Sequence, residues 1–339
     1  MIITKTGDFL PDLCFQKTEY EGIMQNWIKK GLVYSPNGKN GFDRSHCHKP
    51  TPLIIDDATV RVYFGVRDEN SKTRTTFVDL SADDLSKVIY IHDKPVIDLG
   101  KIGCFDDSGA NVCSVVRKDS KIYMYYIGWN PSTTVHTRNS IGVIFSEDNG
   151  LTFHRVYDGS ILDRDKLEPY YTGAVDVKYD EEEKIWKMWY TSGSEWKIVD
   201  GKPEIFYHIK YAVSKNGIDW DKAYTTCIKP VNDIECTARP SVIKENGIYR
   251  MWYSKRNITA FRTDYRNGYR GGYAESDDGI NWRRMDSEFG LDITGSPDDW
   301  DGLAIAYPYV IRIKGKLVMF YNGNGFGKTG FGFAILNGE

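Results

Sequence analysis

The sequence lacks long hydrophobic runs, and no stretch approaches the roughly 20 apolar residues that a membrane-spanning helix needs. It also lacks an excess of charge of one sign, because the net charge is −3 over 339 residues. Such a balance gives no bias toward nucleic acid or an anionic membrane surface. The N-terminus has no basic segment followed by an apolar one, as a secretory signal would. These absences predict a cytoplasmic protein with no membrane span and no nucleic-acid partner.

Paired cysteines are lacking too. The six cysteines include no C-x-x-C pair, so no metal site is predicted, and free thiols are more common than disulfides in a cytosolic chain of this length. Aromatic residues, in contrast, are abundant, with 23 Tyr and 9 Trp making up much of a 14% aromatic fraction. Such side chains suit half-buried strands and sugar-binding platforms equally well.

One pattern occurs five times: VRVYFGVRD, KIYMYYIGWN, IWKMWYTSG, IYRMWYSKR and KLVMFYNGN. The aromatic position that the copies share recurs at intervals of about 62 to 68 residues, at Tyr63, Tyr125, Trp189, Trp252 and Phe320. Each copy alternates large residues and is rich in Tyr, Trp and Val, as in a strand whose two faces differ. Each follows another short apolar strand, so each is predicted to be the second strand of a hairpin.

A third strand follows in most repeats and ends in a turn with Ser, Asp or Asn, and Gly, as in FSEDNGLTF, VSKNGIDW and ESDDGINW. Glycine supplies positive φ there and the Asp or Asn side chain bonds local amides, so these acids are interpreted as turn residues. A more polar fourth stretch comes next. Four strands in each of five repeats predict an all-β fold, a five-bladed β-propeller of four-stranded antiparallel blades whose ring hides the sheet edges.

The two ends of the chain are predicted to close the ring. The last repeat stops at GFGFAILNGE, after its third strand. Segment 27–36, WIKKGLVYSP, has the pattern of the fourth strands, so we expect it to complete blade five. Residues 1–26 are then a lead-in, and residues 1–339 are predicted to form a single propeller domain.

Candidate functional residues cluster where the first strand of each blade begins. These strands run along the central channel of a propeller, so polar residues at their starts face one funnel. Cleavage of a glycosidic bond needs one protonated carboxyl group and one ionised carboxylate. Glu235 is the predicted general acid, Asp107 or Asp106 the base or nucleophile, and Asp176 the carboxylate that orients and tunes them.

Other side chains around the funnel are predicted to bind the sugar, because aromatic rings can stack on sugar faces and arginines can hold a carboxylated or phosphorylated sugar. The arginines could equally neutralise the acids; Arg67, Arg138 and Arg256 are further candidates of this kind. The predicted substrate-binding residues are His48, Arg239, Trp129, Trp196, Tyr207, Asp301 and Tyr307.

The segments GCFDDSGANVCSVV, KMWYTSGSEW, YAESDDGINW and WDGLAIAYP resemble uncharacterised family-43-like propeller proteins of bacterial surface-polysaccharide gene sets. More broadly, nearly the whole chain resembles the five-bladed propeller glycoside hydrolases of families 32, 43, 68, 117 and 130. The resemblance implies a glycosidase or transglycosylase that acts on a carbohydrate or sugar conjugate. It implies no cofactor, other than a structural calcium ion near the channel axis as in some family-43 relatives.

The motifs depart from those families in two places. The Glu235-Cys236 pair resembles the Glu-Cys-Pro general-acid motif of family 32, but the proline here, Pro240, follows five residues after Glu235 instead of two. Asp176 lies where an Asp-Pro motif begins in family 43. Blade one lacks the expected nucleophile or base Asp, since SHCHKPTPLI carries His46 and His48 instead.

Three interpretations of the missing Asp stay open; the nearest acid in the sequence is Asp43. Asp106 or Asp107 from blade two could replace it. His48 could act as the base, since the ordinary histidine pKa near 6.5 suits that role. Alternatively, hydrolysis is lost, and the chain is a non-hydrolytic carbohydrate-binding or polysaccharide-biosynthesis protein that binds a glycan or transfers a sugar.

Overall fold

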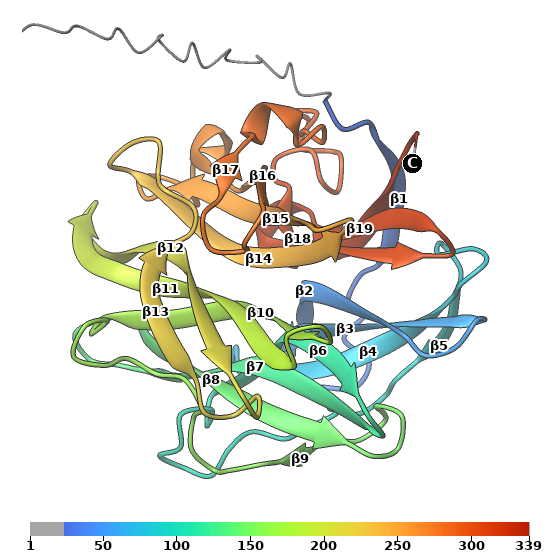
Figure 1. Ribbon diagram of the computed structural model, residues 1–339, viewed down its shortest axis with the longest axis horizontal. Coiled ribbons are helices and arrows are strands. Elements are labelled where there is room, and N and C mark those ends of the chain that lie inside the picture. The colour runs from blue at the N-terminus through green and yellow to red at the C-terminus, as the bar shows by residue number, and fades with distance from the viewer. Residues whose placement is uncertain (1–23, 339) are drawn as a thin grey trace, which may run out of the picture.

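The computed structural model describes residues 24–338, which form the blades of a five-bladed propeller (Figure 1). Blade one contains β2 (Ser45–Ile54), β3 (Thr59–Arg67), β4 (Thr73–Ser81) and β5 (Val88–Ile91), and blade two contains β6 (Gly109–Lys118), β7 (Lys121–Pro131), β8 (Thr137–Ser146) and β9 (His154–Arg155). Blade three contains β10 (Tyr171–Asp180), β11 (Ile185–Val199), β12 (Lys202–Ser214) and β13 (Asp221–Thr226). Blade four contains β14 (Glu235–Glu245), β15 (Ile248–Asn257), β16 (Arg270–Ser276) and β17 (Arg283–Arg284).

Blade five closes the ring with the two ends of the described chain. It contains β18 (Ala306–Ile313), β19 (Lys316–Asn322), β20 (Phe331–Leu336) and β1 (Trp27–Tyr34). β1 pairs antiparallel with β20, from Trp27 opposite Leu336 to Tyr34 opposite Phe331, and the blue and red strands lie side by side in Figure 1. The predicted closing strand is therefore confirmed, although it ends at Tyr34. The predicted lead-in, 1–26, lies almost wholly outside the described residues.

Most connections between blades are longer than the turns within them, and they are largely irregular. Helical turns occur at η1 (Tyr265–Asn267), η2 (Asp286–Glu288) and α1 (Asn324–Gly327). A parallel bridge between Thr73 and Gly109 joins blades one and two into a single eight-stranded sheet. Within the described chain, no helix is long and apolar enough to cross a membrane.

In blades one to four, the aromatic position shared by the repeats bonds the blade to the next one. Hydrogen bonds run from the Tyr63 hydroxyl to the Gly150 carbonyl (2.8 Å), from the Tyr125 hydroxyl to the Gly217 carbonyl (3.0 Å) and from the Trp189 indole to the Gly279 carbonyl (2.7 Å). Each acceptor lies in the Ser-Asp/Asn-Gly turn of the following blade. In blade four, the Trp252 indole donates instead to the side-chain oxygen of Gln25, just before β1 (2.9 Å).

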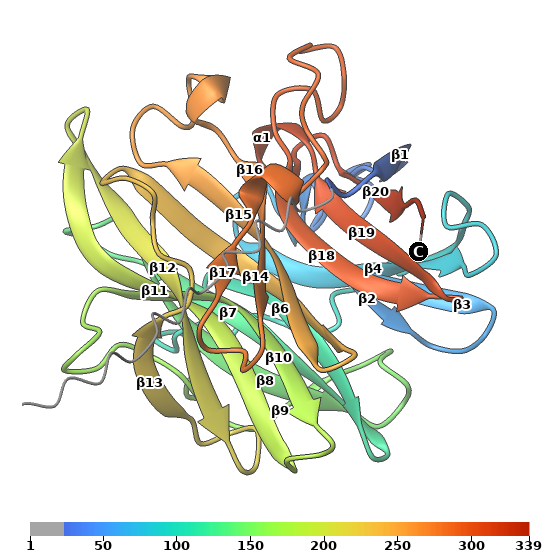
Figure 2. The same ribbon diagram turned by 45° about the horizontal axis from the view of Figure 1, so that its top comes forward.

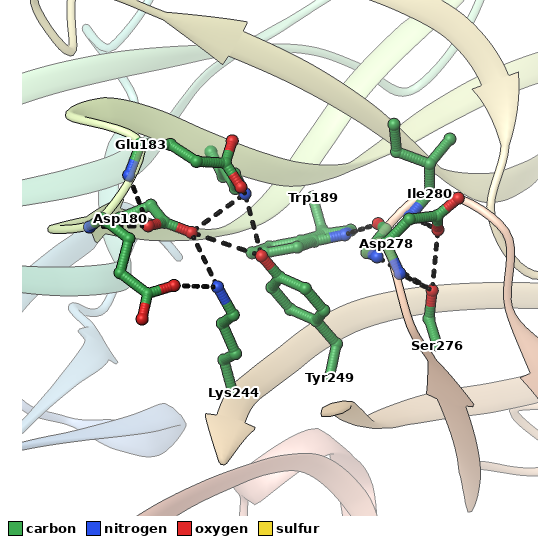
Figure 3. A network of polar contacts seen from close by, with 11 residues as sticks. Asp180, Glu183, Trp189, Lys244, Tyr249, Ser276, Asp278 and Ile280 are labelled. Carbon is green, nitrogen blue, oxygen red and sulfur yellow. Dashed lines mark hydrogen bonds and ion pairs between the residues drawn. The ribbon is translucent and has the colours of Figure 1, made fainter. Parts of the chain in front are cut away.

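Figure 3 shows one of these contacts, between blades three and four, with Trp189 directed at the turn that carries Asp278. Oδ1 of Asp278 accepts hydrogen bonds from the amides of Ile280 and Asn281, at 2.8 and 2.7 Å, and these bonds keep the pKa of Asp278 below its usual range despite desolvation. The prediction that these acids are turn residues is therefore confirmed for Asp278. On the other side of Trp189, the Tyr249 hydroxyl and Asp180 form a polar network across the same two blades.

The hydrophobic core is divided into sectors that lie between neighbouring blades. For example, Tyr125 of blade two packs with Val177 and Met188 of blade three. The first strands of the blades gather near the middle of the molecule, as β6, β10, β14 and β18 do in Figure 2. Their starting ends define the place where a site can form.

Candidate functional site

A cavity of about 470 Å³ lies at the starting ends of the inner strands, within the size range of small-molecule sites. Every blade contributes to its wall through its first strand. These contributions are His48 and Lys49 from β2, Asn111 from β6, Tyr171 and Ala174 from β10, Ala238 and Arg239 from β14, and Tyr307 from β18.

Three blades present a side chain to the cavity from the same strained backbone position. Lys49, Arg239 and Tyr307 have φ values of 53°, 54° and 55°, and each precedes a proline. A left-handed φ is uncommon for residues other than glycine and costs about 1–3 kcal/mol. In each case a side chain of the preceding blade accepts a hydrogen bond from the strained amide; the acceptors are Asn322 (2.8 Å), Thr191 (3.4 Å) and Ser254 (2.8 Å). The ring of blades thus holds these three residues in place.

Arg239 forms the floor of the cavity and links all five blades. Its guanidinium donates to the carbonyl of Cys113 in blade two and to the hydroxyl of Thr51 in blade one, the latter at 3.0 Å. It also lies 3.5 Å from the carbonyl oxygen of Val175 in blade three and 4.9 Å from the ring centroid of Tyr309 in blade five. Because Arg239 is fully buried, most of its hydrogen-bonding capacity serves the fold.

Asp176 does not line the cavity but belongs to a chain of hydrogen bonds between inner strands. Its Oδ2 accepts from the amide of Val242 at 2.7 Å. The hydroxyls of Ser114 and Ser241 occupy the corresponding positions, accepting from the amides of Val177 and Val310 at 3.0 and 2.8 Å. Asp176 therefore occupies a position that serine fills in two other blades.

Glu235 also lies outside the cavity wall. Arg284 of β17 donates to both of its carboxylate oxygens, at 2.6 and 2.7 Å, and the Val231 amide donates to Oε2 at 3.0 Å. The predicted general acid is thus buried in an ion pair between the first and last strands of blade four. The residues of β14 that line the cavity are Ala238 and Arg239.

Asp106 and Asp301 belong to a structural arrangement that recurs in blades two to five. In each, the tyrosine next to the shared aromatic donates to a buried or half-buried acid that is also paired with a basic side chain. The sets are Tyr126 with Asp106 and Arg155, Tyr190 with Glu168 and Lys222, Tyr253 with Asp286 and Lys255, and Tyr321 with Asp301 and Lys29. Asp107 lies beside this arrangement, where it accepts from the Gly103 amide at 3.0 Å.

The structure therefore does not bring the predicted catalytic acids into one space. Among the described residues of the cavity wall, the single carboxylate is Glu204 of β12, which forms an ion pair with Arg262. Glu204 was not predicted because the β11–β12 hairpin extends well beyond the repeated pattern, with strands of 15 and 13 residues.

Positive charge dominates the cavity wall. The cationic side chains are Lys49, Arg67, Arg239, Arg256 and Arg262. His48 and His136 also line it, but burial lowers the pKa of both, that of His48 well below its usual value. Both imidazoles are therefore neutral at pH 7, and the cavity suits an anionic or highly polar ligand.

The predicted substrate-binding residues divide into two groups. His48, Arg239, Trp129, Tyr207 and Tyr307 line the cavity, and Trp196 and Asp301 do not. The Tyr207 hydroxyl lies 2.9 Å from that of Tyr269 and accepts from Arg256 at 2.8 Å, while Arg256 stacks on Phe261. Trp196 instead packs edge-on against Tyr171, outside the wall.

Lys49 lines the cavity but was not predicted from the sequence. It precedes a proline, as Arg239 and Tyr307 do, and this shared position could have identified it.

A calcium ion near the axis does not fit the residues present. Both carboxylate oxygens of Asp176 accept hydrogen bonds, and the Lys178 ammonium lies 3.2 Å from Oδ1. Within residues 24–338, no group of three or more His, Cys, Asp or Glu side chains is placed to hold a metal ion.

The fold and the cavity define a protein with the five-bladed propeller architecture of glycoside hydrolases. The chain aligns with a solved structure named "Glycoside hydrolase" at a TM-score of 0.69 and 18% identity, covering 92% of this protein and 92% of the other. It aligns with a structure from "The GH130 family of mannoside phosphorylases contains glycoside hydrolases that target beta-1,2 mannosidic linkages in Candida mannan" at a TM-score of 0.64 and 14% identity, covering 97% of this protein and 96% of the other. At these identities the likeness establishes the fold alone.

Sequence comparison places the chain more narrowly. It is 34% identical over 313 residues to "Uncharacterized protein Rv1502" of Mycobacterium tuberculosis (strain ATCC 25618 / H37Rv), covering 91% of this chain and 99% of that protein. The match to "Uncharacterized protein MT1551" of strain CDC 1551 / Oshkosh has the same extent. The chain belongs to the family of these mycobacterial proteins. No family model matches it.

Proposed function

We propose that the protein binds a terminal sugar unit of a carbohydrate or sugar conjugate in the central cavity, without hydrolysing it through a pair of carboxylates. The observation that carries this proposal is the composition of the cavity wall. Aromatic and cationic side chains line it, and the one carboxylate among its described residues, Glu204, is already engaged by Arg262.

Hydrolysis by paired carboxylates sets a geometric requirement that this wall does not support. The two carboxyl groups must flank one glycosidic bond, about 5 to 9.5 Å apart. Glu235, Asp106 and Asp176 are each buried among partners of the fold, outside the wall. Their contacts favour structural roles over acid–base chemistry.

The cavity wall, in contrast, carries the kinds of side chain that bind sugars. Trp129, Tyr171 and Tyr307 provide ring faces or edges in the wall for the apolar C–H surfaces of a sugar ring. Tyr207 and Arg256 place a hydroxyl and a guanidinium beside them, which can bond sugar hydroxyls. A few polar groups among apolar ones are typical of small-molecule sites.

The test is a binding screen of neutral and anionic monosaccharides and short oligosaccharides by calorimetry. We expect Trp129→Leu to weaken binding at least tenfold, which corresponds to about 1.4 kcal/mol. Trp220 packs against Tyr125 outside the cavity wall, so Trp220→Leu should leave binding unchanged. Equal binding by both variants and the parent chain, or no binding by any sugar in the screen, contradicts the proposal.

A second candidate is sugar transfer or hydrolysis with Glu204 and His136 as the reacting groups. It is favoured by the presence of both side chains in the wall and by the low pKa of His136, which burial keeps in its neutral, proton-accepting form. Under this candidate, aryl glycosides or nucleotide sugars are turned over, and Glu204→Gln removes turnover but not binding. Release of product by the parent chain would favour this candidate over the first.

A further inference from the structure

We propose that Lys49 and Arg67, at one corner of the cavity, bind a dianionic phosphate monoester group carried by the sugar, with His48 and Asn111 beside them to bond sugar hydroxyls. The proposal rests on the proposed function, since the sugar part occupies the rest of the cavity. The corner itself is defined by charges and polar atoms that the fold leaves unused.

Lys49 and Arg67 are the two cations of the wall whose charged groups form no hydrogen bond or ion pair within residues 24–338, although the Lys49 ammonium lies 5.0 Å from the ring centroid of Tyr307. No acidic side chain within residues 24–338 forms an ion pair with either of them. Arg262, in contrast, is paired with Glu204, and Arg239 and Arg256 donate hydrogen bonds to other groups of the fold. Placing two like charges together in a partly buried site is unfavourable unless an anion offsets it.

Two buried polar groups in the same wall also lack partners. His48 is 4% exposed, and its Nε2 has no hydrogen bond; Asn111 is 7% exposed, and its Oδ1 has none. Because the Asn111 oxygen is an acceptor, it can bond a sugar hydroxyl next to the phosphate but not the phosphate itself. A buried polar atom left without a partner is unfavourable, so both atoms favour a ligand that bonds them. Because burial and the charges of Arg67 and Lys49 keep the pKa of His48 well below its usual value, the ring is neutral. It does not add a third charge and can bond a hydroxyl beside the phosphate.

The charge balance favours a phosphate monoester over a carboxylate. A phosphate monoester carries close to two negative charges above its second pKa of about 6, which matches the two unpaired cations. A carboxylate would offset only one of them. The strained backbone of Lys49, φ 53°, and the bond from its amide to Asn322 hold the corner in place before a ligand arrives.

The experiment is calorimetry of the full chain at pH 7.5 and low salt with inorganic phosphate, glucose 1-phosphate, glucuronate and glucose. Inorganic phosphate probes the corner without any sugar. We expect phosphate to bind and glucose 1-phosphate to bind at least tenfold more tightly than glucuronate or glucose. Arg67→Met should weaken binding of both phosphates at least tenfold. Arg117→Met, on the outer surface beside Asn149, is the matched control and should not.

The outcomes separate this inference from the proposed function. Binding of inorganic phosphate that depends on Arg67, with no effect of any sugar, supports the corner and contradicts the sugar site. Binding of neutral sugars with no preference for phosphate contradicts the corner alone. Tighter binding of glucuronate than of glucose 1-phosphate also overturns the assignment, and so does equal phosphate binding by Arg67→Met and Arg117→Met. Lys49→Met provides a second variant should Arg67→Met fail to fold.

Discussion

Arg284 donates to both carboxylate oxygens of Glu235, at 2.6 and 2.7 Å, and so ties the last strand of blade four to its first. The side chains of Glu235 and Arg284 are only 7% and 15% exposed. This relationship gives the acid at the start of β14 a structural role, and Ala238 and Arg239, three and four residues on, are the side chains of that strand that line the cavity.

Replacing Glu235 by Gln tests this role. The variant breaks a buried ion pair and leaves the Arg284 charge with less compensation, so we expect the free energy of unfolding in urea to fall by about 3 kcal/mol. Glu147→Gln, which removes an exposed pair with Lys121, should cost less than about 1 kcal/mol. Sugar binding should be unchanged in both variants. A Glu235→Gln protein of full stability with no ligand affinity would contradict the structural role.

The contacts between blades predict a second effect on stability. Tyr125→Phe removes the hydroxyl that bonds Gly217 in the next blade and leaves a buried carbonyl without its partner, which should cost about 1–3 kcal/mol. Tyr123→Phe is the matched control, since the Tyr123 ring packs against Trp186 at the same interface and its hydroxyl forms no hydrogen bond with any residue from 24 to 338. Equal unfolding free energies for the two variants in urea would mean that these bonds do not stabilise the ring.

The repeat made the fold predictable, whereas the site depended on contacts that no repeat records. Tyr63, Tyr125 and Trp189 recur because blades one to three bond their neighbours in the same way, so the spacing of these residues predicted the architecture. The position of Glu235 at the start of an inner strand indicated that it lies near the central cavity, but not which way its side chain points. That direction is set by Arg284, 49 residues away in the sequence.

Glu204 is a residue of the cavity wall that could not be predicted from the repeat. It lies on the extended β11–β12 hairpin, opposite Lys197 in the register, where the sequence departs from the repeated pattern. Alignment of the repeats therefore gave no reason to place it at the cavity. Insertions and extensions at one end of the blades lie where they can cover a central site, so residues outside the repeated pattern can line it.

Lys49 should lower the stability of the protein at neutral pH. Burial, with Arg239 and Arg67 nearby and only the Cys113 thiol acting in the opposite sense, lowers its pKa to about 8. The folded state thus binds fewer protons at this lysine than the unfolded state between about pH 8 and 10.5, and stability rises with pH in that window.

Lys49→Met should therefore be more stable than the parent chain at pH 7, with a smaller gain at pH 9.5. Unfolding in urea at the two pH values measures this difference. Lys316→Met, at an exposed position at the start of β19, should show no such pH dependence. A loss of stability in Lys49→Met at pH 7 would show that the lysine is compensated by the fold, which would contradict the unpaired state inferred for it.

Asp176 offers a comparison built into the fold, because Ser114 and Ser241 accept the equivalent interblade hydrogen bonds. Asp176→Ser and Asp176→Ala both remove the carboxylate beside Lys178, so the difference between them isolates the bond to the Val242 amide. We expect Asp176→Ala to be less stable than Asp176→Ser by about 1–3 kcal/mol in urea. Both should retain sugar binding, since Asp176 does not line the cavity. A serine variant that kept its stability but lost sugar binding would contradict this structural role. Asp176 would then differ from Ser114 and Ser241 only in its effect on the ligand, as the functional role predicted from the sequence requires.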